Sequence, residues 1–187
     1  MSVSNISLDS SPIIVVTDSG LGGISVLAEL ERKTIELNPF DSARFIFFNA
    51  HAAEGFGYNS MKNTETKVRV FNTALKSMID KYNPDIVLIA CNTLSVISHL
   101  TDTYRETNIP VLGIVEFGAD LIYNNLMNDD KSIVVIYGTP TTIESDFYRQ
   151  KLIAQGIDES RIINQPCYLL ETEIQKNPGS KSTAAMI

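Results

Sequence analysis

The chain has 187 residues, 44% of them hydrophobic, which is enough to bury a sizeable core in one large domain or two small ones. A net charge of −7 without a Lys or Arg cluster would repel a nucleic-acid backbone, so we expect no nucleic-acid partner. No apolar run approaches the roughly 20 residues that span a bilayer, and the amino-terminal MSVSNISLDS lacks the pattern of a secretory signal. We therefore expect a cytoplasmic protein without a membrane partner. Two cysteines far apart and two histidines make neither a disulfide framework nor a metal site.

Apolar runs typical of strands alternate along the chain with longer segments of helical period. The strands are expected at 12–19, 43–50, 85–90, 109–115, 132–138 and 161–165. The helices are expected at 22–37, 60–82, 93–106, 118–127 and 141–155. Because the strands are apolar on both faces and helices separate them, the pattern predicts an α/β protein with a mostly parallel sheet covered on both sides.

A domain boundary is expected between Ser98 and Pro110, where the polar TDTYRETN ends a helix before proline restarts a strand. This predicts a first domain at 1–98 and a second at 99–187. Periodicity is lost in the last residues, so a disordered or irregular tail is expected from about residue 176.

The segment DSGLGG, which begins at Asp18, follows the first predicted strand. Glycines let backbone amides approach a ligand, and those amides attract an anion such as a carboxylate at the start of the next helix. The alternative is that Asp18 or Ser19 only caps that helix while the glycines make the turn. A dinucleotide site is less favoured, because the spacing is not G-x-G-x-x-G.

Cys91 ends the third predicted strand at the same edge of the sheet, and Asn92 and Thr93 open the next helix. Backbone amides and the positive end of the helix dipole there would favour the thiolate needed by a base or nucleophile. The alternatives are a cysteine that is merely buried, and Asn92 and Thr93 acting only as a cap. No His or Asp lies nearby in sequence to complete a protease triad.

Two further features carry less weight. His51 and Glu54 follow the second strand and could form an acid/base pair, but a solvated loop is the favoured interpretation. Glu116 follows the fourth strand, where facing a ligand and a structural hydrogen bond are equally good interpretations.

The combination of DSGLGG with Ala90-Cys91-Asn92-Thr93 resembles the glutamate racemases of the aspartate/glutamate racemase superfamily. Further segments follow in the family's order. GFGYNS (55–60) resembles its Pro-Tyr-Gly-x-x-Ser element, PVLGIVEFGA (110–119) its Pro-Val-x-Gly-Val element, and YGTPTTIESDFY (137–148) its Thr-x-x-Thr-x-x-Ser element. The resemblance covers roughly 13–171 and implies two similar doubly wound domains facing a cleft, with a homodimer as a candidate assembly.

The resemblance also implies a chemistry. These enzymes interconvert L- and D-glutamate without a cofactor, using two thiols on opposite faces of the substrate, and supply D-glutamate for peptidoglycan, that is, for cell wall biogenesis. Glutamate is therefore the expected substrate, with aspartate as the alternative. Cys91 would be the catalytic acid/base. The expected substrate-binding residues are Asp18, Ser19, Phe56, Gly57, Asn92, Thr93, Thr139 and Thr142.

The departures from the family pattern leave other functions open. The second catalytic cysteine lies in a Gly-Cys-Thr-His motif, which this sequence lacks, and Cys167 matches a noncatalytic cysteine instead. Gly55 and Phe56 replace the family's proline and tyrosine. The chain thus looks like a racemase truncated before its second thiol, with an incomplete first domain. A silent or regulatory binding protein of the same fold is the alternative, and a lyase or hydrolase using one thiol is a third possibility.

Overall fold

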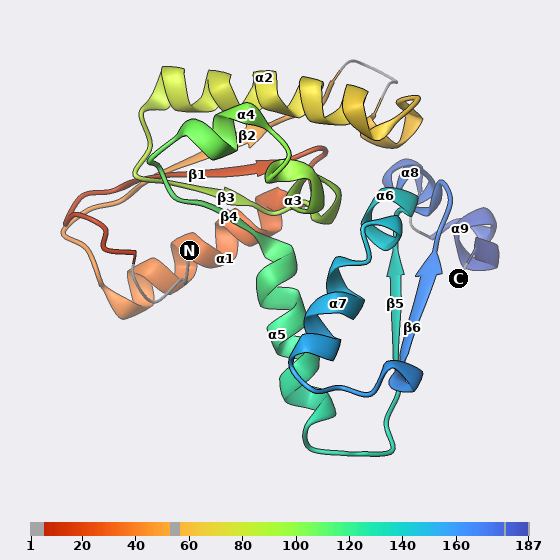
Figure 1. Cartoon of the computed structure of the whole chain (residues 1–187). Helices are drawn as coiled ribbons and strands as arrows, with labels where there is room; N and C mark the ends of the chain where they lie inside the picture. The colour runs from red at the N-terminus through yellow and green to blue at the C-terminus, as the bar shows by residue number, and fades with distance from the viewer. Residues whose placement is uncertain (1–5, 53–56, 178, 187) are drawn as a thin grey trace. The chain divides into compact units, whose positions relative to one another are not determined.

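The computed structural model describes residues 6–52, 57–177 and 179–186. The chain divides into two compact units, Met1–Ile114 and Val115–Ile187, each with its own sheet (Figure 1). Across the described part of the chain, none of the helices combines the length and apolar composition that a membrane crossing requires.

The first unit is built on a four-stranded parallel sheet of order β2-β1-β3-β4. The strands are β1 (Ile13–Asp18), β2 (Arg44–Asn49), β3 (Ile86–Ile89) and β4 (Val111–Gly113). β1 pairs with β2 on one side and β3 on the other, so that Thr17 lies beside both Phe48 and Ile89. The predicted parallel α/β architecture is confirmed, because strands apolar on both faces become the buried centre of this sheet.

Helices cover both faces of this sheet (Figure 1). α1 (Gly23–Leu37) lies on one side, where Leu27 and Leu30 pack against the buried cluster of Ile14, Val16 and Ile86. α2 (Thr64–Tyr82) lies on the opposite side and follows the short 3-10 helix η2 (Tyr58–Ser60). The buried side chains of α2 are Phe71, Leu75 and Met78.

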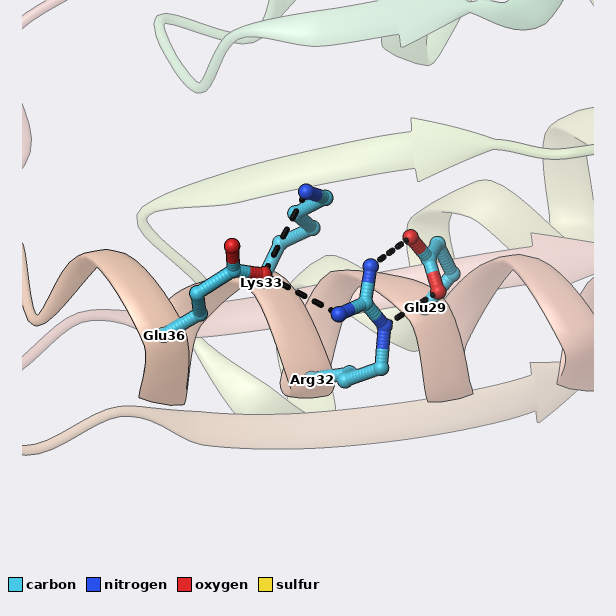
Figure 2. Close-up of polar contacts among 4 residues, drawn as sticks. All are labelled: Glu29, Arg32, Lys33 and Glu36. Atoms are coloured by element: carbon cyan, nitrogen blue, oxygen red, sulfur yellow. Dashed lines mark hydrogen bonds and ion pairs between the residues drawn. The ribbon is translucent and has the colours of Figure 1, made fainter.

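The outer surface of α1 carries a charged cluster (Figure 2). The Arg32 guanidinium bridges Glu29 and Glu36, which lie one turn away on either side, and Lys33 also reaches Glu36. These side chains are about half exposed, so the pairs define the solvent face of the helix and contribute little to stability.

The helix expected at 93–106 is two helices, α3 (Asn92–Ser98) and α4 (Asp102–Glu106). Thr101 separates them. Its buried hydroxyl donates to the Ser98 carbonyl over 2.7 Å and accepts from the Tyr104 amide over 3.2 Å. One threonine therefore closes α3 and caps α4, which residue periodicity does not reveal.

The two units divide after Ile114, whereas the sequence places the boundary after residue 98. Residues 99–113 stay with the first unit because β4 pairs with β3, with Val87 beside Val111 and Ile89 beside Gly113. α5 (Ile114–Leu126) begins directly after β4, several residues before the expected start at 118. The chain thus passes between the units at the first residues of a helix.

The second unit has a two-stranded parallel sheet formed by β5 (Val134–Gly138) and β6 (Ile162–Pro166). α5 and α7 (Phe147–Ala154) pack on one face of it. The core there consists of Leu126, Ile136, Leu152, Ile157 and Ile162. The other face leaves Ile133, Val135, Tyr137 and Ile163 exposed.

The remaining elements of this unit depart from the expected pattern at two places. The helix expected at 141–155 is broken into α6 (Pro140–Glu144) and α7, because Asp146 takes the left-handed conformation with φ 55°. The short 3-10 helix η3 (Glu159–Arg161) precedes β6.

Where the sequence predicts a disordered or irregular tail from about residue 176, the structure has α9 (Lys181–Met186) after α8 (Leu170–Lys176). The Ser180 hydroxyl accepts from the Thr183 amide over 3.1 Å and thereby caps the start of α9.

Candidate active site

The site is set by the order of the strands in the first unit. β1 and β3 are neighbours, although α1, β2 and α2 lie between them in sequence. The chain leaves β1 and β3 in loops that meet at the carboxyl edge of the sheet, where the strand order reverses direction. Asp18 and Ser19 come from the first loop and Cys91 from the second, so the fold brings the DSGLGG and ACNT segments together.

The contact between Ser19 and Cys91 is the most informative one at this edge. The Ser19 Oγ and Cys91 Sγ atoms are 3.2 Å apart, within hydrogen-bonding distance, and either can be the donor. Cys91 is a free thiol, only partly exposed, and takes the N-cap position of α3. The helix thus starts at the sulfur-bearing residue, with Asn92 and the buried Thr93 in its first turn.

The Asp18 carboxylate organises the glycine loop. Its Oδ1 accepts from the Gly20 amide over 3.2 Å, and its Oδ2 accepts from the Gly23 amide over 2.5 Å. A Cβ at Gly23 would lie 2.9 Å from the Asp18 Cβ and 3.1 Å from the Ala90 Cβ. Asp18 therefore caps the start of α1, which is the structural role that the sequence offered as the alternative to ligand binding. A carboxylate has about four lone-pair sites, so it retains capacity for a further donor.

The electrostatic environment keeps the Cys91 thiol protonated near neutral pH. Burial of the sulfur and the charge of Asp18 raise the pKa of Cys91 above its ordinary value. The Ser19 hydroxyl and the backbone amides of Leu94 and Ser19 act in the opposite direction, with smaller effect. The helix start therefore does not produce a standing thiolate in the free protein. The thiolate would be a strong base once formed.

Tyr58 is a residue of this site that sequence reasoning missed. It is 2% exposed, and its hydroxyl has no hydrogen-bond partner among the described residues. Burial raises the pKa of the Tyr58 phenol, and the nearby charge of Cys91 raises it further. An unpaired buried hydroxyl beside a thiol suits a bound polar group. The sequence held one sign of this residue, an aromatic side chain directly after Gly57. It falls on an unspecified position (x) of the Pro-Tyr-Gly-x-x-Ser element, so the resemblance did not point to it.

Other predicted residues of the first unit take the following places. Gly57 precedes η2 in extended backbone, and, its chain neighbours apart, no atom of the described residues lies within 4 Å of the position a Cβ would take. Phe56 and Glu54 lie outside the described residues. His51 is exposed, and its Nδ1 is 3.2 Å from the Ser19 carbonyl oxygen, so it contacts the DSGLGG loop.

The structure brings Thr139 and Thr142 together within the second unit. Their hydroxyl oxygens are 3.1 Å apart, and Thr139 Oγ1 also accepts from the Thr142 amide as the N-cap of α6. Thr142 is 3% exposed. The pair follows β5, so it lies at the carboxyl end of the second sheet as Asp18 and Cys91 do in the first.

Glu116 and Cys167 have structural surroundings. Glu116 on α5 forms a short contact with Lys151 on α7, which also pairs with Asp120 over 3.2 Å. The Cys167 amide donates to the Gly138 carbonyl over 2.8 Å and extends the pairing of β6 with β5. Within the described ranges, no group of three or more His, Cys, Asp or Glu side chains could hold a metal ion.

Comparison with known proteins identifies the family of this chain. The family model of the Asp/Glu/Hydantoin racemases matches residues 14–187, so the chain belongs to that family. A glutamate racemase from Campylobacter jejuni is 33% identical over 144 residues, which is 76% of this chain and 52% of the relative.

Solved structures show the same likeness. The crystal structure of a Campylobacter jejuni glutamate racemase superposes with a TM-score of 0.71 at 25% identity, covering 93% of this chain and 64% of that one. A Francisella tularensis glutamate racemase, solved in complex with D-glutamate, gives a TM-score of 0.65 at 25% identity, covering 92% and 59%. The chain therefore spans between about half and two thirds of the length of these relatives.

Proposed function

We propose that this chain carries the first-thiol half of a cofactor-independent glutamate racemase, a cytoplasmic isomerase that supplies D-glutamate for peptidoglycan. The observation that carries the proposal is the 3.2 Å contact between Ser19 Oγ and Cys91 Sγ at the carboxyl edge of the first sheet. Membership of the racemase family and the likeness to glutamate racemases support it. The relative solved with D-glutamate makes that amino acid the first substrate to test.

The chemistry follows from the surroundings of the thiol. The α-proton of an amino acid is a very weak acid, so its removal needs a strong base held away from water. The raised pKa of Cys91 fits that requirement, because the thiolate, once formed, is more basic than one in water. A substrate ammonium group beside Asp18 would offset the carboxylate charge that opposes the thiolate.

The other candidate residues would bind the substrate. Asp18 and Ser19 would hold the ammonium group and orient the thiol, while Asn92 and Thr93 would hold a carboxylate. The proposed residues of the second unit, Thr139 and Thr142, offer paired hydroxyls for the remaining carboxylate. Phe56 and the backbone flanking Gly57 complete the proposed set.

The missing second thiol limits what the chain can do alone. A single thiolate removes a proton from one face of the α-carbon and returns it to the same face, which restores the starting enantiomer. The sequence lacks the Gly-Cys-Thr-His motif that would place a donor on the other face. The chain should therefore exchange the α-proton of one enantiomer much faster than it inverts it. The same absence favours a silent binding or regulatory protein as the second candidate.

Proton NMR of D- and L-glutamate in deuterium oxide separates these functions. We expect loss of the α-proton signal of one enantiomer with little inversion. Cys91→Ser should abolish the exchange, because an alcohol is too weak an acid to supply the base. Cys167→Ser is the matched control and should retain it. Racemisation that disappears in Cys167→Ser would assign Cys167 as the second acid/base. Binding of glutamate without exchange would instead establish the silent protein.

A further inference from the structure

The Ser95 hydroxyl connects two chain segments that meet near the thiol. It donates to the Cys91 carbonyl oxygen over 2.7 Å and accepts from the Ile114 amide over 3.1 Å. The Ile89 carbonyl, at 3.3 Å, is a second acceptor within reach. Since a hydroxyl has one donor and two acceptor sites, a single side chain joins the backbone after β3 to the backbone at the start of α5.

Packing fixes the position of this hydroxyl. Ser95 is 6% exposed, and a Cβ on Gly113 would lie 2.8 Å from the Ser95 Cβ and 2.9 Å from its Oγ. Only glycine lets β4 approach α3 so closely. The side chain is therefore held between α3 and the end of β4.

The Ser95 hydroxyl joins the backbone that bears the thiol to the residue at which the first unit ends. On one side, the Cys91 carbonyl accepts both the Ser95 hydroxyl and the Ser95 amide, the latter over 2.9 Å, so the backbone that bears the sulfur is held twice. On the other side, Ile114 is the last residue of the first unit and the first residue of α5. The connection thus runs from the thiol-bearing residue to the point where the chain enters the second unit.

We propose that Ser95 is a positioning residue, which holds the Cys91 backbone so that the sulfur stays against Ser19 and links that geometry to the start of α5. The inference rests on the proposed function only in taking Cys91 as the reacting thiol. Its direct consequence is that the Ser19 to Cys91 contact depends on the Ser95 hydroxyl. A backbone movement at the start of α5 would shift the Ser95 hydroxyl, and the Cys91 backbone that it holds would move with it.

A double-mutant cycle tests this dependence in the full chain carrying Cys167→Ser, so that only Cys91 reacts. The measurement is the rate of Cys91 alkylation by iodoacetamide as a function of pH. Ser19→Ala should raise the pH midpoint by about one unit, because it removes a hydrogen bond that stabilises the thiolate. In a Ser95→Ala background, the same Ser19→Ala change should shift the midpoint by less than half as much.

Ser98→Ala is the matched control, since Ser98 is equally buried on the same helix and its hydroxyl donates to the Ser95 carbonyl over 2.9 Å. In that background, the full effect of Ser19→Ala should remain. An undiminished Ser19→Ala shift in the Ser95→Ala background would overturn the proposal. So would the absence of any Ser19→Ala shift in the parent chain. Neither result depends on racemase activity, because no substrate is present.

Amide hydrogen exchange supplies a second test that needs no variant at position 95. Alkylation of Cys91 in the parent chain should speed exchange at the Ile114 amide, whose acceptor is the Ser95 hydroxyl. The Asn83 amide, bonded to the Ile79 carbonyl over 2.9 Å at the end of α2, is the internal control and should not change. Equal exchange at Ile114 before and after alkylation would contradict the link.

Discussion

Cys91 lies between a carboxylate that opposes its ionisation and donors that favour it, and burial decides the balance. Because the folded-state pKa is raised above the unfolded value, the folded protein keeps its proton in a range where the unfolded chain loses it. The corresponding stability is fully present below the unfolded pKa of about 8.5 and is lost as pH rises through the folded pKa.

We therefore expect the free energy of unfolding to fall as pH rises through the range just above about 8.5, and to fall less in Cys91→Ser. That window lies below the titration of Tyr58 and Tyr148, whose pKa values burial also raises, that of Tyr148 to about 12. Urea unfolding of both proteins across the window gives the difference. Parallel pH profiles would mean that the Cys91 pKa is not raised.

Tyr58 presents the opposite case, a buried group that the fold does not satisfy. Its hydroxyl lacks a partner among the described residues, so removing it should not cost a hydrogen bond. Tyr58→Phe should leave the free energy of unfolding unchanged or raise it by up to about 1 kcal/mol, while weakening glutamate binding or α-proton exchange. Thermal unfolding and the NMR exchange assay measure the two effects. A variant that is less stable but equally active would make the hydroxyl structural.

At the scale of the element, the glycine loop after β1 determines where α1 begins. Gly23 has no room for a side chain, because a Cβ would lie 3.0 Å from the Phe47 ring and still closer to Asp18. Gly23→Ala must therefore shift α1 against the sheet, and we expect a loss of about 1–3 kcal/mol of stability. Gly57→Ala is the control, since among the described residues no atom other than those of its chain neighbours lies within 4 Å of the added Cβ. Equal stability of the two variants in urea unfolding would contradict this packing.

The alternation of strands and helices could be predicted because each first-unit strand is a short apolar run and each long helix has one apolar face. The two places where an expected helix is broken could not be predicted. The cap at Thr101 is a pair of side-chain hydrogen bonds, and the break at Asp146 is one left-handed residue, so neither changes the hydrophobic period. The sequence could not indicate that residues 99–113 stay with the first unit, because the pairing of β4 with β3 is a long-range contact.

The candidate site shows the same limit. Asp18, Ser19 and Cys91 could be predicted to lie at one edge because they follow strands that a parallel sheet aligns, and the resemblance to glutamate racemases singled them out as candidate site residues. Ser95 and Tyr58 could not, because their significance lies in a bond to Ile114 and in a missing partner, both of which need three-dimensional structure.

At the scale of the whole molecule, the sheet of the second unit has one face with exposed apolar side chains. Parallel strands are normally covered on both faces, yet one face of β5 and β6 leaves Val135 38%, Tyr137 60% and Ile163 43% exposed. Burying an exposed apolar face is favourable, so we expect this face to promote association with another copy.

The 187-residue chain should therefore self-associate in a concentration-dependent way. The double variant Val135→Lys/Tyr137→Lys should weaken the association, because it places two charges on that face. Ile35→Lys is the matched control, because Ile35 is 74% exposed on α1 and belongs to the first unit. Sedimentation velocity over a wide concentration range measures all three proteins. A parent chain that stays monomeric, or one whose association is lost only in Ile35→Lys, would show that this sheet face does not drive assembly.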